Sequence, residues 1–542
     1  MTSTARAGAF GRADTVTTTV VPAPDGTALA TDHCLPEGEG PFPVVLLRTP
    51  YGRHHHRAEL RAWARHGFAA VAQDVRGRHG SAGRWLPYRH EADDGAATAR
   101  RLREQPWSDG TLVAVGSSYA AHCALELALA APEARADAVI AAVPALGLAE
   151  TAREPSGCER LLARAGWWAA HGDRRDSDEH ALDRALDRDP DLLDHLPVLD
   201  LPRRLGRAMP SWPRVWRARR GEATEEGRPR GLAGAGAARV PLLAVGGTHD
   251  PFAADTVALW RHWGGRTRLL LGPWGHRLTA APGPDASPAA HRLPLGRLYA
   301  RWARAATSGR TAPGRGGAVA LGGSDLWVAA DALAPRGTVP YRFRDSRDLR
   351  GSDGGDGTGW TAEGVLRLVR GREFTADPRH PVRSDDLSVP AHGAPDRCLL
   401  VSAPLPRPLD LLGGAEARLT VFADAPDADW AVRLVALGPD GTAAPLATGV
   451  ERVRAAPGRA VEARVPLGPL ARRLPAGTRL RLEVAGHHFP AHARNPHTGE
   501  DPVTATVLRP SRRAVRPDGS ALLLPVTDPG PRPVDPFQEI CR

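Results

Sequence analysis

The sequence predicts an α/β domain that is interrupted by a helical insertion and followed by an all-β domain. Short apolar runs alternate with helical patterns from residue 15 to residue 143, and this alternation resumes at residue 240. The chain between these two stretches is helical and highly charged, and Pro- and Gly-rich turns separate short alternating strands in the last part. Strands that alternate with helices imply a mostly parallel sheet with helices on both faces.

The first part of the predicted α/β domain spans residues 1–144. Its expected strands cover residues 15–21, 27–34, 44–47, 68–72, 112–115 and 138–143, and its expected helices cover residues 58–66, 90–104 and 119–131. Runs such as 44–47 and 68–72 are apolar throughout, which is typical of strands buried on both faces. These strands therefore predict the centre of the sheet.

The predicted insertion spans residues 145–237, and the second part of the α/β domain spans 238–310. Expected strands at 240–245 and 268–271 and an expected helix at 289–307 belong to this second part. Because the insertion leaves the sheet and then rejoins it, we expect a helical cap over the functional face.

Residues 311–542 predict a jelly-roll-like β-sandwich. Its expected strands are 415–423, 430–437, 460–465, 478–485 and 503–508, and the Gly-rich run 350–359 predicts a loop.

The composition excludes several classes of protein. The 542-residue chain has a formal charge of +10, but all its basic residues are arginines, and they are scattered among acids. A nucleic-acid-binding surface needs clustered charge, so we expect no nucleic-acid partner. No run approaches the roughly 20 apolar residues of a membrane span, and residues 1–14 lack the apolar core of a signal peptide. Five dispersed cysteines fit a reducing compartment. We therefore expect a cytoplasmic protein without membrane contact, and the sequence leaves a homodimer open.

A turn between a buried strand and a helix holds the first candidate catalytic residue. The segment Gly116-Ser117-Ser118-Tyr119-Ala120 follows the strand 112–115 and precedes the helix 119–131. It matches the nucleophile-elbow pattern G-x-S-x-G with alanine in the last position, and this strand–turn–helix context presents a serine hydroxyl at the carboxyl end of a sheet. Ser118 is therefore the candidate nucleophile, although a Gly-Ser-Ser turn can also be an ordinary helix cap.

Two later strands end in the residue types that such a serine needs. Asp250 follows the strand 240–245, and His276 follows the strand 268–271. The order Ser, Asp, His along the chain is that of the α/β-hydrolase fold, in which the acid orients the histidine and the histidine activates the serine. Either residue alone would more simply be a helix cap or a loop histidine, but three suitable residues at three strand ends favour a catalytic triad.

Several segments resemble the CocE/NonD family of serine hydrolases, which includes the X-Pro dipeptidyl-peptidases. The matching segments are Arg48–Tyr51, Gln73–Arg78, Gln105–Trp107, Gly116–Tyr119, Gly246–Asp250, Gly272–His276, Ser402–Leu405 and Arg494–Pro496. The resemblance implies an α/β-hydrolase domain, an inserted helical cap and a C-terminal jelly roll. Ala121 stands where the family has a glycine, and Arg219–Ala238 lacks the family's aromatic and acidic stretch at the end of the cap.

The resemblance also implies roles for aromatic residues. The hydroxyl of Tyr51 and the backbone N–H of Tyr119 would form the oxyanion hole, and Trp167, Trp168 and Trp274 are candidates for substrate binding. The run His54-His55-His56 is expected to be a loop near the rim of the site rather than a metal site, because three adjacent histidines cannot all face one ion. No nucleotide-binding loop occurs, so we expect neither a metal nor another cofactor.

The leading functional hypothesis is a carboxylesterase that acts on a small ester through an acyl-enzyme on Ser118. An X-Pro dipeptidyl-peptidase that cleaves an amide or short peptide, and a biosynthetic acyltransferase, would use the same residues. A catalytically dead, carbohydrate-binding protein is the alternative outside the enzymes. The intact Ser, Asp and His set argues against it.

Overall fold

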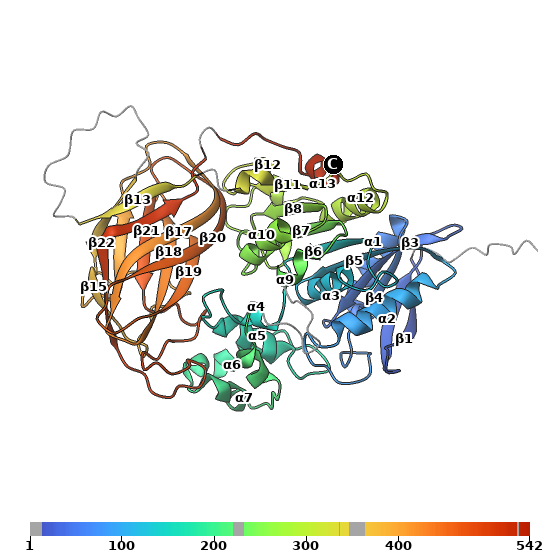
Figure 1. Ribbon diagram of the computed structural model, residues 1–542, viewed down its shortest axis with the longest axis horizontal. Coiled ribbons are helices and arrows are strands. Elements are labelled where there is room, and N and C mark those ends of the chain that lie inside the picture. The colour runs from blue at the N-terminus through green and yellow to red at the C-terminus, as the bar shows by residue number, and fades with distance from the viewer. Residues whose placement is uncertain (1–13, 221–231, 335–336, 346–363, 528–529) are drawn as a thin grey trace, which may run out of the picture.

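The computed structural model describes residues 14–220, 232–334, 337–345, 364–527 and 530–542. It consists of an α/β body and an all-β body that lie side by side, with a group of short helices below and between them (Figure 1). This arrangement confirms the predicted fold class. The predicted loop 350–359 and most of the divergent end of the cap lie outside the described residues.

The α/β body contains a sheet of ten described strands in the order β1-β2-β4-β3-β5-β6-β7-β8-β11-β12. The strands are β1 (Val16–Pro22), β2 (Ala28–Cys34), β3 (Phe42–Thr49), β4 (Ala69–Asp74), β5 (Ser108–Ser117), β6 (Ala138–Ala142), β7 (Leu242–Gly247), β8 (Thr267–Gly272), β11 (Arg315–Ala320) and β12 (Trp327–Ala329). The strands from β4 through β11 in this order run parallel, and β1, β2 and β12 add antiparallel edges. Every residue of β4, β6, β7 and β8 is buried, which explains the apolar runs within these strands.

Helices cover both faces of this sheet. One face packs against α2 (Glu91–Arg103), α3 (Tyr119–Ala128) and α10 (Ala253–His262), and the other packs against α1 (Arg57–Arg65), α12 (Leu295–Thr307) and α13 (Pro536–Cys541). The expected helix 289–307 is divided into α11 (Pro288–His291) and α12, with Pro294 between them. A short hairpin of β9 (Trp274–Gly275) and β10 (Leu278–Pro282) follows β8.

The inserted segment forms six short α-helices among the described residues. They are α4 (Leu148–Ala152), α5 (Leu161–Ala170), α6 (Ala181–Arg188), α7 (Leu201–Arg204), α8 (Trp212–Arg217) and α9 (Leu232–Ala235), and the 3₁₀ turns Leu192–Asp194 and Val198–Asp200 lie between α6 and α7. The apolar core of this segment includes Tyr119 from the α/β body and Phe489 and Val503 from the β body. The insertion is therefore packed against both bodies.

The C-terminal body is a single strongly curved sheet of β-strands. Its order is β19-β18-β21-β16-β14-β13-β22-β17-β20, and β15 pairs with β22. The strands are β13 (Val339–Arg344), β14 (Gly364–Arg370), β15 (Glu373–Ala376), β16 (Arg397–Ser402), β17 (Leu409–Ala423), β18 (Asp427–Leu437), β19 (Ala443–Arg454), β20 (Val461–Leu474), β21 (Arg479–Ala485) and β22 (Ser511–Leu524). The terminal strands β19 and β20 lie against each other, so the sheet is nearly barrel-shaped around an apolar interior.

Two sequence-based boundaries need correction. The α/β sheet does not stop at residue 310, because β11 pairs with β8 and β12 pairs with β11. The chain also returns to this body at its end, where Ile540 of α13 enters the core beside α12. The predicted strand 503–508 is absent: the Asp501 carboxylate accepts a hydrogen bond from the Val503 N–H and holds a turn, and the strand follows at β22.

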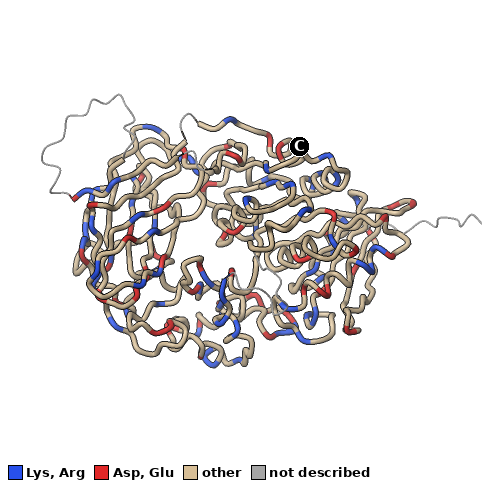
Figure 2. Tube along the Cα trace, viewed as in Figure 1, with Lys and Arg blue, Asp and Glu red and all other residues tan. Residues whose placement is uncertain are grey.

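Arginines and acidic residues alternate throughout the Cα trace of both bodies (Figure 2). Arg48, Arg78 and Arg513 are among the largest fully buried side chains. Much of the arginine content is therefore used inside the molecule, as hydrogen-bond donors to carbonyls and carboxylates. None of the helices in the described ranges is long and apolar enough to cross a membrane.

Candidate active site

Ser118 lies on a strained turn at the end of a central strand. Its backbone has φ 59°, an unusual value for a residue other than glycine, and α3 begins at the next residue. The turn brings β5 and α3 together so closely that a Cβ on Gly116 would lie 2.1 Å from the carbonyl oxygen of Ala120. Only glycine fits at position 116. The methyl of Ala121 is accommodated in the apolar core under α3.

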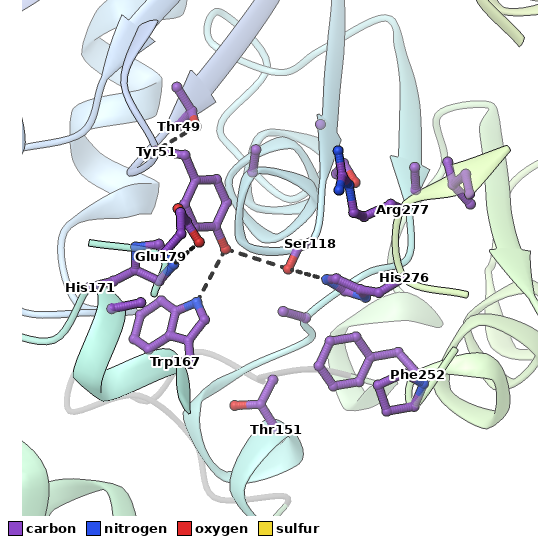
Figure 3. A pocket seen from close by; sticks show the side chains of 18 of the residues that line it. Thr49, Tyr51, Ser118, Thr151, Trp167, His171, Glu179, Phe252, His276 and Arg277 are labelled. Atoms are coloured by element: carbon purple, nitrogen blue, oxygen red, sulfur yellow. Dashed lines mark hydrogen bonds and ion pairs between the residues drawn. The ribbon is translucent and has the colours of Figure 1, made fainter. Parts of the chain in front are cut away.

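The structure brings Ser118, His276 and Asp250 together (Figure 3 shows the first two). His276 Nε2 lies 3.0 Å from Ser118 Oγ, and His276 Nδ1 lies 2.7 Å from Asp250 Oδ1. Asp250 is buried in the turn after β7, and His276 follows β9. A histidine that donates from Nδ1 to the carboxylate presents an unprotonated Nε2 to the serine hydroxyl. This arrangement can therefore remove the serine proton during nucleophilic attack.

Tyr51 approaches the same serine from the opposite side (Figure 3). Its hydroxyl lies 3.5 Å from Ser118 Oγ and accepts a hydrogen bond of 3.3 Å from the indole N–H of Trp167. The backbone N–H of Tyr119 lies close enough to this hydroxyl to act against the rise in its pKa. Burial raises the pKa of Tyr51, so the hydroxyl keeps its proton at neutral pH and remains a donor. Two donors, the Tyr51 O–H and the Tyr119 N–H, thus converge beside the serine.

The side chain of Tyr119 points away from Ser118 into the core of the protein, whereas its backbone N–H lies beside the site. Its hydroxyl donates to Glu91 and accepts from the backbone N–H of Tyr88, and its ring stacks on Trp167 with the centroids 6.0 Å apart. These contacts anchor the start of α3 and hold Trp167 in position.

A cavity of about 880 Å³ opens in front of Ser118. Trp167 from the insertion and Phe252 from the turn after β7 line it, and the Phe252 ring contacts the His276 ring edge to face. Three acidic residues, Glu59, Glu179 and Asp183, also line the cavity, but their side chains are 40%, 64% and 72% exposed. The cavity therefore has aromatic side chains near the serine and acidic residues at its rim.

Two of the three tryptophans expected to bind substrate do not line this cavity. Trp168 is buried in the core of the insertion, where its N–H donates to Ser211 Oγ at 2.8 Å. Trp274 is buried under the hairpin β9–β10, where its N–H donates to the Ala290 carbonyl at 3.2 Å. Neither ring is exposed to the cavity, because both pack into apolar cores.

The histidine run lies at the cavity rim. His54 and His55 belong to the 3₁₀ turn Arg53–His56, and His56 lines the cavity with its Nδ1 2.9 Å from Glu59 Oε2. Across the described part of the chain, no group of three or more His, Cys, Asp or Glu residues is placed to hold a metal ion.

Phe252 and Arg164 are among the residues of the cavity wall that the sequence had not singled out. Phe252 follows Asp250 by two positions and could have been found from its place in the turn after a sheet strand. Arg164 precedes Trp167 by three positions, which puts both on one face of α5. An arginine on an otherwise apolar helix face is the feature of the sequence that could have indicated Arg164.

A mostly parallel sheet with a strained serine turn at its centre is the framework of the α/β-hydrolases. Fold and site together define the class of this protein as a serine hydrolase. Comparison with known proteins then identifies the family. Residues 25–277 match the model described as X-Pro dipeptidyl-peptidase (S15 family), and residues 315–519 match the model described as X-Pro dipeptidyl-peptidase C-terminal non-catalytic domain. The chain belongs to this family of CocE/NonD and X-Pro dipeptidyl-peptidase-like serine hydrolases.

Full-length relatives share the whole architecture. The chain is 25% identical over 540 residues to cocaine esterase of Rhodococcus sp. (strain MB1 Bresler), covering 89% of this chain and 92% of the relative. An aminopeptidase from the marine sediment archaeon Thaumarchaeota archaeon matches with a TM-score of 0.74 at 18% identity, covering 97% and 99% of the two chains. An alpha-amino acid ester hydrolase matches with a TM-score of 0.72 at 18% identity, covering 97% and 100%. At these identities the two solved structures establish the fold.

Proposed function

We propose that this protein is a carboxylesterase in which Ser118 is the nucleophile, His276 the general base and Asp250 its orienting partner. The observation that carries the proposal is the chain of contacts from Asp250 through His276 to Ser118, at 2.7 and 3.0 Å. Ser118 Oγ attacks the ester carbonyl while His276 Nε2 takes its proton. His276 then gives the proton to the departing alcohol, which leaves an acyl-enzyme on Ser118.

A water molecule completes the cycle. His276 takes a proton from the water, whose oxygen attacks the acyl-enzyme, and the proton then returns to Ser118 Oγ as the carboxylic acid is released. In both tetrahedral intermediates, the Tyr51 hydroxyl and the Tyr119 N–H would donate to the oxyanion. The cavity wall of Trp167 and Phe252 suits an apolar part of the substrate.

An X-Pro dipeptidyl-peptidase is the second candidate, and the family match favours it. Such an enzyme needs an acid that holds the free α-amino group of its substrate. The cavity-lining acids Glu59, Glu179 and Asp183 are exposed at the rim, and each lies beside a histidine. This placement supports ester hydrolysis over release of dipeptides.

Labelling with a fluorophosphonate probe tests the proposal. Wild type and Ser117→Ala should be labelled, and Ser118→Ala should not, with the adduct mapped to the peptide that contains Ser118. Ser117 is the matched control, because it is the neighbouring serine on the same turn. Hydrolysis of short-chain aryl esters should then exceed that of X-Pro amides. Labelling that survives in Ser118→Ala would overturn the assignment of the nucleophile, and faster cleavage of X-Pro amides would favour the peptidase.

A further inference from the structure

Arg164 is a buried arginine in the wall of the cavity that holds Ser118. It lies on α5, only 5% of its surface is exposed, and its guanidinium carbon is 5.9 Å from the centre of the Trp167 ring. Trp167 in turn donates its indole N–H to the Tyr51 hydroxyl beside the serine. Arg164 thus belongs to the inner wall of the cavity rather than to its charged rim.

The guanidinium of Arg164 has no partner among the described residues. It forms no ion pair or hydrogen bond with them, and its Nε is buried. Two other arginines nearby do have acceptors: Arg160 forms a two-pronged ion pair with Glu154, and Arg78 donates to the backbone carbonyls of Pro50 and His171. Arg164 therefore differs from its neighbours in lacking an acceptor, not in being buried.

The charge of Arg164 persists despite this burial. Desolvation lowers its pKa to about 10, which still leaves the side chain protonated at neutral pH. The Tyr88 hydroxyl interacts electrostatically with this charge, but burial raises the pKa of Tyr88, so this group is neutral and cannot balance the charge. A buried and unpaired cation is strongly unfavourable unless an anion joins it. In a substrate cavity, the group that can supply this anion is the ligand.

We propose that Arg164 binds a carboxylate carried by the acyl part of the substrate, so that the enzyme cleaves half-esters of dicarboxylic acids. The planar guanidinium matches a carboxylate with two parallel hydrogen bonds. This inference rests on the proposed esterase function, whose substrate class it specifies.

The acyl part is assigned by the positions of the other groups around Ser118. His276 must lie beside the leaving alcohol, because it protonates that group. Tyr51 and Trp167 lie on the other side of Ser118 from His276 (Figure 3), and Arg164 packs against Trp167. The wall that contains Arg164 therefore faces the acyl group, and the reaction would release an alcohol and a dicarboxylate.

Kinetic selectivity gives the first test. Monomethyl and dimethyl esters of straight-chain dicarboxylic acids from succinic to suberic acid would be compared by methanol release. Wild type should prefer at least one monomethyl ester over its dimethyl counterpart. In Arg164→Met, the ratio of the two kcat/KM values should fall by about 10- to 100-fold, mainly through KM, since a hydrogen-bonded charge is removed. Arg164→Lys should retain part of the preference.

The matched control is Arg188→Gln, which removes an exposed arginine of the insertion, on α6. This variant should keep the wild-type ratio, because it changes the net charge but not the cavity wall. If Arg164→Met kept the wild-type ratio as well, the proposed subsite would be overturned while esterase activity still stood. If no ester of either kind were hydrolysed, the proposed function itself would fail.

Binding separates the subsite from catalysis. In the Ser118→Ala background, free adipate or suberate should raise the melting temperature, and Arg164→Met should abolish that shift. Without ligand, Arg164→Met should melt at the same or a higher temperature than its parent, because an uncompensated buried charge is removed. An unchanged ligand shift, or a melting temperature several degrees lower without ligand, would instead make Arg164 a structural residue.

Discussion

The hydroxyl of Tyr51 and the Oγ of Ser118 lie 3.5 Å apart, at the ends of two neighbouring parallel strands. Tyr51 follows β3 by two residues and Ser118 follows β5 by one. Because β3 and β5 pair in the centre of the sheet, their carboxyl ends meet at the same edge. The hydroxyl is further fixed by the Trp167 N–H, so the tyrosine is held in place before substrate binds.

Tyr51→Phe should lower kcat by about 10²–10³ with little change in KM, because the donor matters most when the oxyanion forms. Steady-state hydrolysis of an aryl ester measures both constants. Tyr341→Phe, which removes a buried hydroxyl from the β body, should behave as wild type. A kcat in Tyr51→Phe within twofold of wild type would exclude this hydroxyl from the oxyanion hole.

Much of the site could be predicted because its residues follow strands. Ser118, Asp250 and His276 each come after a buried apolar run, and parallel strands bring such ends to one edge. The environment of a side chain on a helix was harder to predict. Trp167 and Trp168 are adjacent, so they point about 100° apart, and sequence alone could not tell which one faces the cavity. Strand β11 was missed because its first half is Arg315-Gly316-Gly317, which carries no hydrophobic signal.

Gly116→Ala should abolish activity by displacing the turn that carries Ser118. The added Cβ would lie 2.1 Å from the Ala120 carbonyl oxygen, which is backbone and cannot rotate away. The contact must push β5 and α3 apart, and Ser118 with them. The variant should lose fluorophosphonate labelling as well as ester turnover. The matched control is Gly296→Ala on the first turn of α12, where a Cβ meets nothing within 4 Å and helix propensity improves. Equal activity in Gly116→Ala would contradict the close approach of strand and helix.

The β body should lose stability as the pH falls below about 6.5. His497 is buried, its Nδ1–H donates to the Arg509 carbonyl, and its Nε2 accepts from Arg513, so the folded protein needs the neutral ring. Burial lowers the pKa of His497 to about 4, whereas an unfolded histidine titrates near 6.5. Between pH 6.5 and pH 4, the unfolded protein therefore binds a proton at this histidine that the folded protein does not. The contribution of the neutral ring to the free energy of unfolding is fully present above pH 6.5 and decreases toward pH 4.

The loss from His497 alone should reach about 2 kcal/mol at pH 5. Melting temperatures measured from pH 7.5 to pH 5 should therefore fall more steeply for wild type than for His497→Asn. Asparagine is chosen because position 497 has φ 59°, which asparagine tolerates well. Replacing the exposed His380 with asparagine should leave the wild-type pH dependence unchanged. Parallel curves for wild type and His497→Asn would show that this ring is not the origin of the acid sensitivity.

The insertion and the β body are joined by a buried ion pair, which predicts a large effect of removing one partner. Arg452 on β19 donates to Glu159 at 2.9 Å and to Asp429 at 2.7 Å, and all three side chains are almost fully buried. Arg452→Met would leave two buried carboxylates without this cation, which should destabilise the protein by about 3–5 kcal/mol. Urea denaturation, followed by tryptophan fluorescence, should show the midpoint shifted to lower urea.

Two further variants distinguish the effect of an unpaired buried carboxylate from the effect of losing the packing of the arginine side chain. Asp429→Asn combined with Arg452→Met removes the carboxylate whose one ion pair among the described residues is with Arg452, so the double variant should be more stable than Arg452→Met alone. Arg464→Gln, in the exposed pair with Glu462 on β20, should leave the urea midpoint nearly unchanged. If the double variant were less stable than Arg452→Met, packing of the arginine stem rather than the unpaired carboxylate would account for the loss. The contact between insertion and β body would then depend on side-chain packing more than on charge.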